Sequence, residues 1–222
     1  GLFFLSRTDV PKWDEEFEFW ENCEVPMGDN VARFSRIALP SGLDDDGMLH
    51  WLNNINVDAV VCSGSRRNVT TWEEWMDSAA SLMRVASTSG SPTLGICFGH
   101  QLLCKSLGSE VTRAEKMSSG VWEMILNKDG MCDELFETRW ESGRGPEVVY
   151  SHQDHVITVP DNCILLGSAE HNTVTAVRIV DSRDKKMPAW GVQFHPEAAR
   201  HRIERAYTVS YTHLTLPTNH PV

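Results

Sequence analysis

Cys97 lies between two glycines in the stretch Gly95-Ile96-Cys97-Phe98-Gly99, where an apolar run gives way to a helical one. This G-x-C-x-G pattern is typical of a nucleophile elbow, a sharp strand-to-helix turn at which absent side chains let the two elements pack closely. The start of a helix favours the thiolate form of a cysteine. A buried structural cysteine at an ordinary turn fits the same pattern, so the motif alone leaves both interpretations open.

His195 is the best candidate for the base that a cysteine nucleophile needs. It ends the strand-like run "WGVQF" and is followed by Pro196 and Glu197. The proline restricts the backbone, so the Glu197 carboxylate can hold the imidazole while the ring serves the thiol. His100 is nearer in sequence, but it lies on the helix that leaves the turn, and we expect its side chain to point away from Cys97.

Alternating strands and helices must position these residues. Apolar runs predict strands at residues 2–5, 31–40, 57–65 and 91–96. Helical spacing predicts helices at residues 13–20, 42–56, 70–87 and 100–108. The third of these helices has a candidate capping box in Thr71 and Glu74. The order predicts an α/β, flavodoxin-like fold: an open, mostly parallel sheet with helices on both faces.

The second half of the chain is dominated by strand-like runs. They cover residues 120–126, 147–159, 163–170, 173–180 and 189–195, and a helix-like stretch follows at 197–206. We expect these strands to form a mixed extension of the same sheet, so that residues 1–205 make one domain. Residues 206–222 are rich in threonine and lack core periodicity, which predicts a non-native or disordered tail.

Composition narrows the classes of function. The 222 residues carry 20 basic and 31 acidic side chains, a net charge of −11, which argues against a nucleic-acid partner. No apolar run reaches the roughly 18–20 residues that span a bilayer, so no membrane association is predicted. The six cysteines are dispersed, without zinc spacing, which predicts reduced thiols in the cytoplasm and neither a metal nor a cofactor. Cys104 is expected in the core.

Four ordered stretches together resemble the class I glutamine amidotransferase family. The elbow "GICFGHQLL" and the later "GVQFHPE" place Cys97 and His195 as in that family. Before the elbow, "VVCSGSRRN" resembles the family's oxyanion-loop strand. "YSHQDHVITVP" resembles the Ser-His-x-Asp segment most familiar from the amidotransferase domain of GMP synthetase. The resemblance covers roughly residues 30 to 205.

This resemblance implies a catalytic triad. Cys97 would attack the side-chain amide of glutamine, His195 would act as general base and acid, and Glu197 would orient the imidazole. A γ-glutamyl thioester forms, ammonia leaves, and water releases glutamate. Backbone N–H groups of Ser65 and Phe98 would form the oxyanion hole.

The resemblance also implies a set of substrate-binding residues. Gln101 matches a family residue that contacts bound glutamine, while the backbone of Ser151 and His152 matches a segment that holds its α-amino and α-carboxylate groups. Asp154 would fix that segment, and Gly64 belongs to the loop beside the substrate. Without the resemblance, the favoured interpretation of residues 151–154 is a polar turn between strands.

One departure from the family pattern concerns the oxyanion loop. Family members usually continue as Gly-Gly-Pro, whereas this chain has Gly64-Ser65-Arg66, which predicts strain at a position that favours glycine. A Gly-Ser pair is also found in stand-alone members that resemble plant γ-glutamyl peptidases. Arg66 and Arg67 place positive charge near the expected pocket, where they could meet a substrate carboxylate or remain solvated.

The sequence is consistent with three alternative functions. The first is a glutamine-hydrolysing amidotransferase that supplies ammonia to a separate synthetase subunit, because no phosphate loop or synthetase signature follows Glu197. The second is a stand-alone γ-glutamyl peptidase for glutathione-like compounds, favoured by the missing synthetase signature and by the Gly-Ser loop. The third is a silent binding protein, which the intact Cys97, His195 and Glu197 argue against. In the first two the substrate is a small molecule.

Overall fold

The computed structural model describes residues 38–55, 57–136 and 145–198, together with the backbone of three strands nearer the amino terminus. Its strands are β1 (Leu2–Leu5), β2 (Glu24–Met27), β3 (Asn30–Arg36), β4 (Ala59–Cys62), β5 (Thr93–Ile96), β6 (Val111–Glu123), β7 (Ile125–Leu126), β8 (Glu147–Val156), β9 (Cys163–Ala169), β10 (Asn172–Val180) and β11 (Lys186–Val192). Its helices are α2 (Asp45–Asn54), α3 (Trp75–Ser89), α4 (Phe98–Ser106), α5 (Lys128–Met131) and the 3₁₀ turn η1 (Glu134–Phe136).

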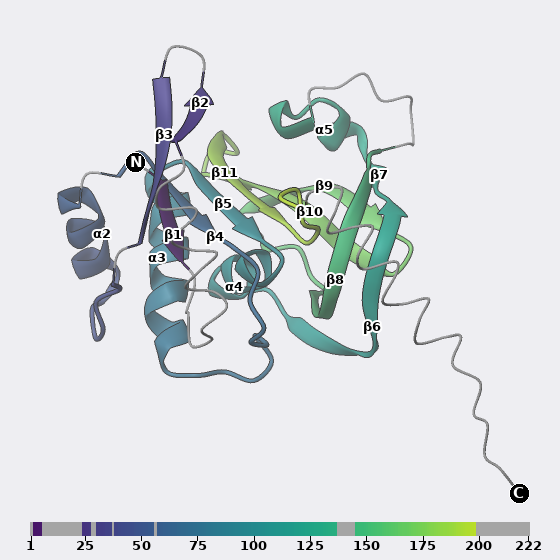
Figure 1. The fold of residues 1–222 in the computed structure, drawn as a ribbon, viewed down its shortest axis with the longest axis horizontal. Coiled ribbons are helices and arrows are strands. Elements are labelled where there is room, and N and C mark those ends of the chain that lie inside the picture. Colours follow the sequence, from purple (N-terminus) through teal and green to yellow (C-terminus); the bar gives the residue numbers. More distant parts are fainter. Residues whose placement is uncertain are drawn as a thin grey trace, which may run out of the picture.

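A nine-stranded sheet forms the centre of the molecule (Figure 1). Its order is β2-β3-β1-β4-β5-β11-β10-β9-β7, in which β3, β1, β4, β5 and β11 are parallel neighbours. The antiparallel strands β10, β9 and β7 extend it on one side. The predicted flavodoxin-like, mostly parallel α/β fold is confirmed.

Strands β6 and β8 correct one part of that prediction. They pair with each other in a separate two-stranded sheet instead of extending the main one, and in Figure 1 they run side by side at one end of the molecule. β6 also begins at Val111, well before the predicted run at 120. Residues 112–119 are mostly exposed or half-buried, so they carry little of the apolar pattern from which a strand is predicted.

Helix α3 packs against both α2 and α4 beside the parallel strands (Figure 1). In α3, apolar side chains at helical spacing are buried in the core, including Met76, Ala79, Leu82, Met83 and Ala86. The amino-terminal end of α2 is capped by Asp44, whose carboxylate accepts a hydrogen bond from the Gly47 N–H at 2.8 Å.

The predicted capping box of α3 is wrong. Glu74 already has helical dihedral angles at the cap position and makes no side-chain capping bond. The residues before it form turns, and the Trp72 indole donates to Asp77 in the first turn of the helix at 2.9 Å. Thr71 therefore lies too far from the helix start to cap it. The predicted helix at 13–20, most of that at 197–206 and the tail 206–222 lie outside the described residues.

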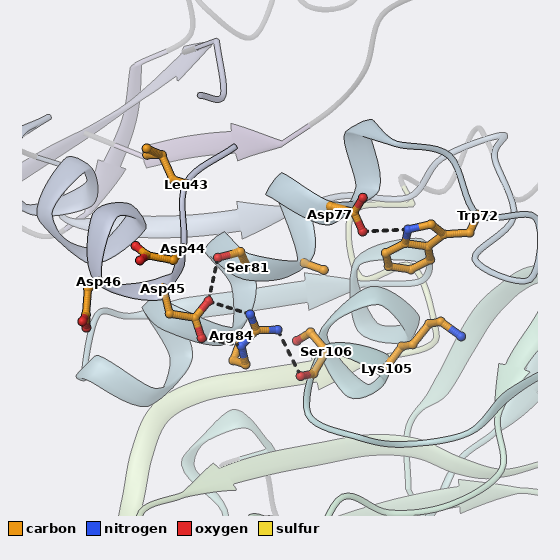
Figure 2. A pocket seen from close by; sticks show the side chains of 11 residues that line it. Leu43, Asp44, Asp45, Asp46, Trp72, Asp77, Ser81, Arg84, Lys105 and Ser106 are labelled. Atoms are coloured by element: carbon orange, nitrogen blue, oxygen red, sulfur yellow. Dashed lines mark hydrogen bonds and ion pairs between the residues drawn. The ribbon is translucent and has the colours of Figure 1, made fainter. Parts of the chain in front are cut away.

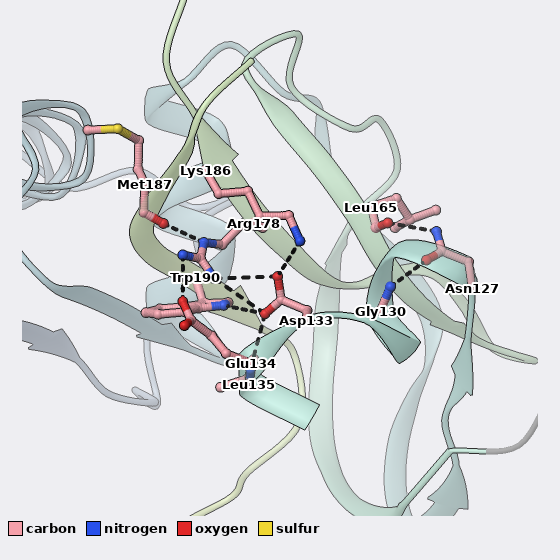
Figure 3. Close-up of polar contacts among 10 residues, drawn as sticks. All are labelled: Asn127, Gly130, Asp133, Glu134, Leu135, Leu165, Arg178, Lys186, Met187 and Trp190. Carbon is pink, nitrogen blue, oxygen red and sulfur yellow. Dashed lines mark hydrogen bonds and ion pairs between the residues drawn. The ribbon is translucent and has the colours of Figure 1, made fainter. Parts of the chain in front are cut away.

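A charge cluster centred on the buried Asp133 and Arg178 connects η1 to the β10–β11 hairpin (Figure 3), on the face of the sheet opposite α3 and α4. The Asp133 carboxylate accepts from the Trp190 indole N–H at 2.9 Å, and Arg178 and Lys186 lie 3.4 and 3.3 Å from it. Arg178 stacks on the Trp190 ring at 3.9 Å and pairs with Glu134 at 2.8 Å. Burial opposes the charge on Asp133, but the Trp190 N–H and the other donors outweigh it and lower its pKa.

Removing this carboxylate should destabilise the fold. Asp133→Ala leaves the buried Arg178 guanidinium with only the exposed Glu134 carboxylate as a counterion, so we expect the free energy of unfolding to fall by about 3–5 kcal/mol. The loss should be largest above about pH 4, the ordinary pKa of an aspartate, and should shrink at lower pH as the wild-type carboxylate is protonated.

Urea denaturation across this pH range measures the effect. Asp161→Ala, which removes an exposed carboxylate, is the matched control and should change stability by no more than about 0.5 kcal/mol. Equal effects of the two substitutions would contradict the role assigned to the cluster.

Candidate active site

Three neighbouring strands bring the predicted catalytic residues to one edge of the sheet. β4, β5 and β11 are adjacent and parallel, so their carboxyl ends share an edge, which is where open α/β sheets place their ligands. The loop from Ser63 to Ser65 follows β4, Cys97 follows β5, and His195 comes shortly after β11. Residues far apart in sequence therefore converge there.

Cys97 occupies a sharp bend between β5 and α4. Its backbone is at φ 52° and ψ −102°, a rare conformation for a residue with a side chain. Gly99 allows the bend, because a Cβ there would lie 2.0 Å from the carbonyl oxygen of Cys62. The Cys97 side chain is buried, and α4 begins at the next residue. The structure thus has the geometry of the predicted elbow.

His195 is held by Glu197 and lies beside Cys97. Its Nδ1 is 2.7 Å from Glu197 Oε1. A Cβ built on Gly64 would lie 2.8 Å from His195 Cε1 and 3.8 Å from Cys97 Cβ, so the ring and the cysteine flank the same glycine. Burial alone would lower the pKa of His195, but the Cys97 sulfur and the Glu197 carboxylate raise it to about 10. This arrangement favours an imidazolium next to the sulfur.

Strand β8 forms a second wall over this edge. The Ser151 carbonyl oxygen lies 3.7 Å from the Cys97 sulfur. The backbone N–H of His195 donates to the Val149 carbonyl at 2.8 Å. Residues 151–154 thus belong to a continuous strand and not to a polar turn. The Ser151 side chain is exposed, whereas His152 is buried and donates from Nδ1 to the Asp154 carbonyl at 3.0 Å. Burial is the main cause that lowers the pKa of His152 to about 4.

Asp154 connects this wall to two other parts of the site. Its carboxylate accepts from the Thr70 N–H and hydroxyl at 2.9 and 2.7 Å, and Arg113 lies 3.2 Å away. Its carbonyl accepts from the Gln101 amide at 2.6 Å, and that amide also donates to Gln193 Oε1 at 3.1 Å. The loop after β4, the helix α4 and the β11 end are therefore linked through one residue.

The sequence analysis did not predict that Thr70, Arg113 and Gln193 belong to the hydrogen-bond network around Asp154. Gln193 carried a usable signal, because a polar residue two positions before His195 interrupts an otherwise apolar run. Thr70 and Arg113 carried none, since each acquires its role only when β8 comes beside the loop and β6. The side-chain amide nitrogen of Gln101 is used within the protein, since it donates to the Asp154 carbonyl and to Gln193.

Ser65 does not carry the predicted backbone strain. Within the described part of the chain, positive φ at a non-glycine residue occurs only at Cys97 and Asp184. The Ser65 hydroxyl instead accepts from the Arg67 N–H at 3.0 Å, a side-chain turn that stabilises the loop without glycine. The expectation of strain was wrong because the loop has an ordinary conformation here.

The other candidate residues lie away from the site or are enclosed. Cys104 is fully buried, and its sulfur lies 3.6 Å from His100 Nδ1. His100 Nε2 faces the Val174 carbonyl at 3.1 Å, so His100 points to the core as expected. Burial lowers the pKa of His100 to about 4.

A hollow of about 830 Å³ on the helical surface contains none of the site residues. Asp45 and Arg84 pair across it at 2.6 Å, and the Lys105 and Trp72 side chains also line it (Figure 2). In the described ranges, no three side chains of His, Cys, Asp or Glu converge as metal ligands would. Among the helices described, none is long and apolar enough to cross a membrane.

Comparison with known proteins identifies a matching family. The model of the family described as "Glutamine amidotransferase class-I" matches residues 37–209. A glutamine-hydrolyzing GMP synthase from Rhizobium etli is 34% identical over 139 residues, which are 63% of this chain and 24% of that protein. The matched part thus spans about a quarter of that relative's length.

Two further comparisons concern one relative in sequence and one neighbour in structure. One subunit of a glutamine-hydrolyzing GMP synthase from Sulfurisphaera tokodaii is 34% identical over 145 residues, which cover 63% of this chain and 67% of that protein. The crystal structure of a glutamine amidotransferase from Thermotoga maritima superposes with a TM-score of 0.62. It is 18% identical and covers 96% of this chain and 82% of its own, so that likeness shows the fold.

The electrostatics of His195 predict an unusual titration. The imidazole should keep its proton through neutral pH and lose it near pH 10. Because this pKa is raised above the unfolded value of about 6.5, the corresponding stability is fully present below that pH and is lost as the pH rises towards 10. Nuclear magnetic resonance of the ring protons measures the midpoint directly.

Glu197→Gln should move this midpoint downward, because it removes the negative charge that holds the imidazolium. Asp161→Asn removes an exposed carboxylate and should leave it in place. A wild-type midpoint near 6.5, or equal shifts in both variants, would contradict the pairing described above.

Proposed function

Because residues 37–209 match its model, the chain belongs to the class I glutamine amidotransferase family, and we propose that it hydrolyses the side-chain amide of glutamine through a thioester on Cys97. The observation that supports this most directly is the convergence of the Cys97 elbow and the His195–Glu197 pair beside Gly64. A nucleophile, a base and an orienting group within reach of one another are the signature of covalent acyl transfer.

The first half of the reaction forms the thioester. The Cys97 thiolate attacks the γ-carbonyl carbon, and the electron pair of the carbonyl moves to its oxygen. When the tetrahedral intermediate collapses, the carbon–nitrogen bond breaks and His195 gives its proton to the leaving nitrogen, which departs as ammonia. Glu197 stabilises the imidazolium that supplies this proton and keeps the ring oriented.

The second half restores the enzyme. A water molecule gives a proton to the now neutral His195 as its oxygen attacks the thioester carbon. The carbon–sulfur bond breaks, the sulfur leaves as a thiolate paired with the imidazolium, and glutamate is released. The ring thus acts first as acid and then as base.

Backbone amides are proposed to bind the negative oxygen of each tetrahedral intermediate. The Phe98 N–H belongs to the first turn of α4, whose amides have no intrahelical acceptor and carry the positive end of the helix dipole. The Ser65 N–H is the proposed second donor, and it comes from a loop that the Arg67 N–H helps to hold. Losing one such donor typically slows the reaction about 10²–10³-fold.

The glutamyl part of the substrate is proposed to bind along β8. The backbone carbonyl of Ser151 adjoins the sulfur, and the side-chain carbonyl oxygen of Gln101 is the atom proposed to contact the substrate. His152 and Asp154 would keep this wall in place through their mutual hydrogen bond. Gly64 leaves room for the ring of His195, because any side chain at that position would meet it.

Two uses of the thioester remain as candidates. The S. tokodaii relative is named as one subunit of a synthase, which favours ammonia supply to a separate synthetase subunit. The Gly64-Ser65-Arg66 loop favours instead a stand-alone γ-glutamyl peptidase that acts on glutathione-like compounds. Both uses begin with the same attack by Cys97, so they differ only in what leaves and what accepts.

Cys97 and Cys104 provide a matched test of the nucleophile. Cys97→Ala should reduce glutamate formation from glutamine by about a thousandfold or more, because no thioester can form. Cys104→Ala should keep most of the activity, since this thiol is fully buried beside His100. Release of glutamate and ammonia, and labelling by a glutamine-analogue electrophile, are the measurements. Equal loss in both variants would show that the nucleophile has been misassigned.

Gly64 provides a test of the ring position. A Cβ in Gly64→Ala would lie 2.8 Å from His195 Cε1, so the ring must move, and displacements of this size can cost about a hundredfold in rate. We expect kcat/KM for glutamine to fall accordingly while the circular dichroism spectrum is unchanged. The control is Gly47→Ala on helix α2, whose Cβ would come closest to the Asp44 carboxylate, at 3.1 Å. Wild-type kinetics in Gly64→Ala would contradict the ring position.

A further inference from the structure

The leaving group of the substrate must lie on the His195 side of the Cys97 sulfur. This follows from the proposed reaction, because the same imidazole that flanks the sulfur gives its proton to the departing nitrogen. The loop after β4 runs along that side, since a Cβ on Gly64 would touch the His195 ring before it reached Cys97. Arg66 follows Gly64 by two residues, so its Cα lies within about 7 Å of the Gly64 Cα, and its long side chain can reach the space into which a leaving group would project.

Arg66 lies at the centre of a turn in this loop. The Ser65 hydroxyl accepts from the Arg67 N–H at 3.0 Å, which closes a tight turn with Arg66 at its centre. The Arg67 guanidinium is directed to Glu73, with Nε 3.5 Å from the carboxylate. Arg66 is exposed and forms no ion pair with any residue of the described ranges. In this turn the Arg67 guanidinium is paired with Glu73, whereas the Arg66 guanidinium can bind a ligand.

The charge of Arg66 stands out against the rest of the chain. Acidic side chains outnumber basic ones by 31 to 20, so a free cation at this edge is not part of a generally basic surface. A guanidinium binds carboxylates in a planar, two-pronged geometry that suits small acidic ligands. Ammonia, the leaving group of glutamine, offers no carboxylate, whereas an amino acid or peptide released from a γ-glutamyl compound does.

We propose that Arg66 determines leaving-group specificity by binding the carboxylate of an amino acid or peptide attached through its amine to the γ-glutamyl group. This inference rests on the proposed thioester chemistry and names its substrate class as γ-glutamyl amino acids and γ-glutamyl peptides. The carbon–sulfur bond forms as before, the carbon–nitrogen bond breaks, and the His195 proton goes to the released α-amine. Water then completes hydrolysis to glutamate and the free amino acid or peptide.

Three substrates that differ only in the leaving group test this role. They are glutamine, γ-glutamylalaninamide and γ-glutamylalanine, of which only the last has a carboxylate on the leaving side. The wild-type enzyme should show a higher kcat/KM for γ-glutamylalanine than for its neutral amide. Arg66→Met should lower kcat/KM for γ-glutamylalanine about tenfold, the loss of one charge-assisted hydrogen bond, and leave the two neutral leaving groups unchanged.

Two further variants separate charge from structure. Arg66→Lys keeps the positive charge and should retain part of the preference for γ-glutamylalanine. Arg67→Met removes a positive charge one residue away, but its guanidinium faces Glu73, so any effect should be equal for all three substrates.

The outcomes distinguish a failure of the proposed thioester chemistry from a failure of the role proposed for Arg66. No turnover of any substrate by the wild-type enzyme would contradict the thioester chemistry, and the role of Arg66 would fall with it. Turnover of γ-glutamylalanine that Arg66→Met leaves unchanged, or reduces equally for all three substrates, would overturn the role of Arg66 while the hydrolase itself stands.

Discussion

The close approach of helix α4 to strands β4 and β5 determines where the Cys97 sulfur lies. A Cβ at Gly99 would lie 2.0 Å from the Cys62 carbonyl oxygen, and one at Gly95 would lie 2.6 Å from the Gly99 carbonyl oxygen. The backbones therefore pack at a distance that no side chain permits. Between the two elements the chain turns at Cys97, which has the rare backbone conformation of φ 52°.

The rest of the site follows from the sheet that this bend joins. Because β4, β5 and β11 are parallel neighbours, the loop at Gly64, the thiol and the imidazole all emerge at one edge. The separate β6–β8 sheet then covers that edge from outside, and Asp154 binds it to the loop after β4 through Thr70. Each wall of the site thus belongs to a different element, and hydrogen bonds to Asp154 hold these walls in a fixed relative position.

The two main charged pairs of the molecule differ in their exposure to solvent. On the η1 face, Asp133 and Arg178 are buried, and each is surrounded by partners of opposite charge or by N–H donors, an arrangement that stabilises a fold only while every member is present. At the Cys97 edge, the His195–Glu197 pair is partly open to solvent. In the proposed reaction a proton of this pair must reach the substrate, a role that the Asp133–Arg178 pair does not have.

The sequence by itself determined the local features of the protein. The sequence was sufficient to predict the turn at Cys97 from its glycines, the His195-Pro196-Glu197 run and the helix α3 from its apolar spacing. Turn geometry and helical periodicity depend on residues close together in the chain. Only the tertiary structure decided that β6 and β8 leave the main sheet, that Ser65 is unstrained, and that Thr70 and Arg113 meet Asp154. Those outcomes depend on which distant segments pair, and no local pattern encodes that choice because the contacts exist only after the chain has folded.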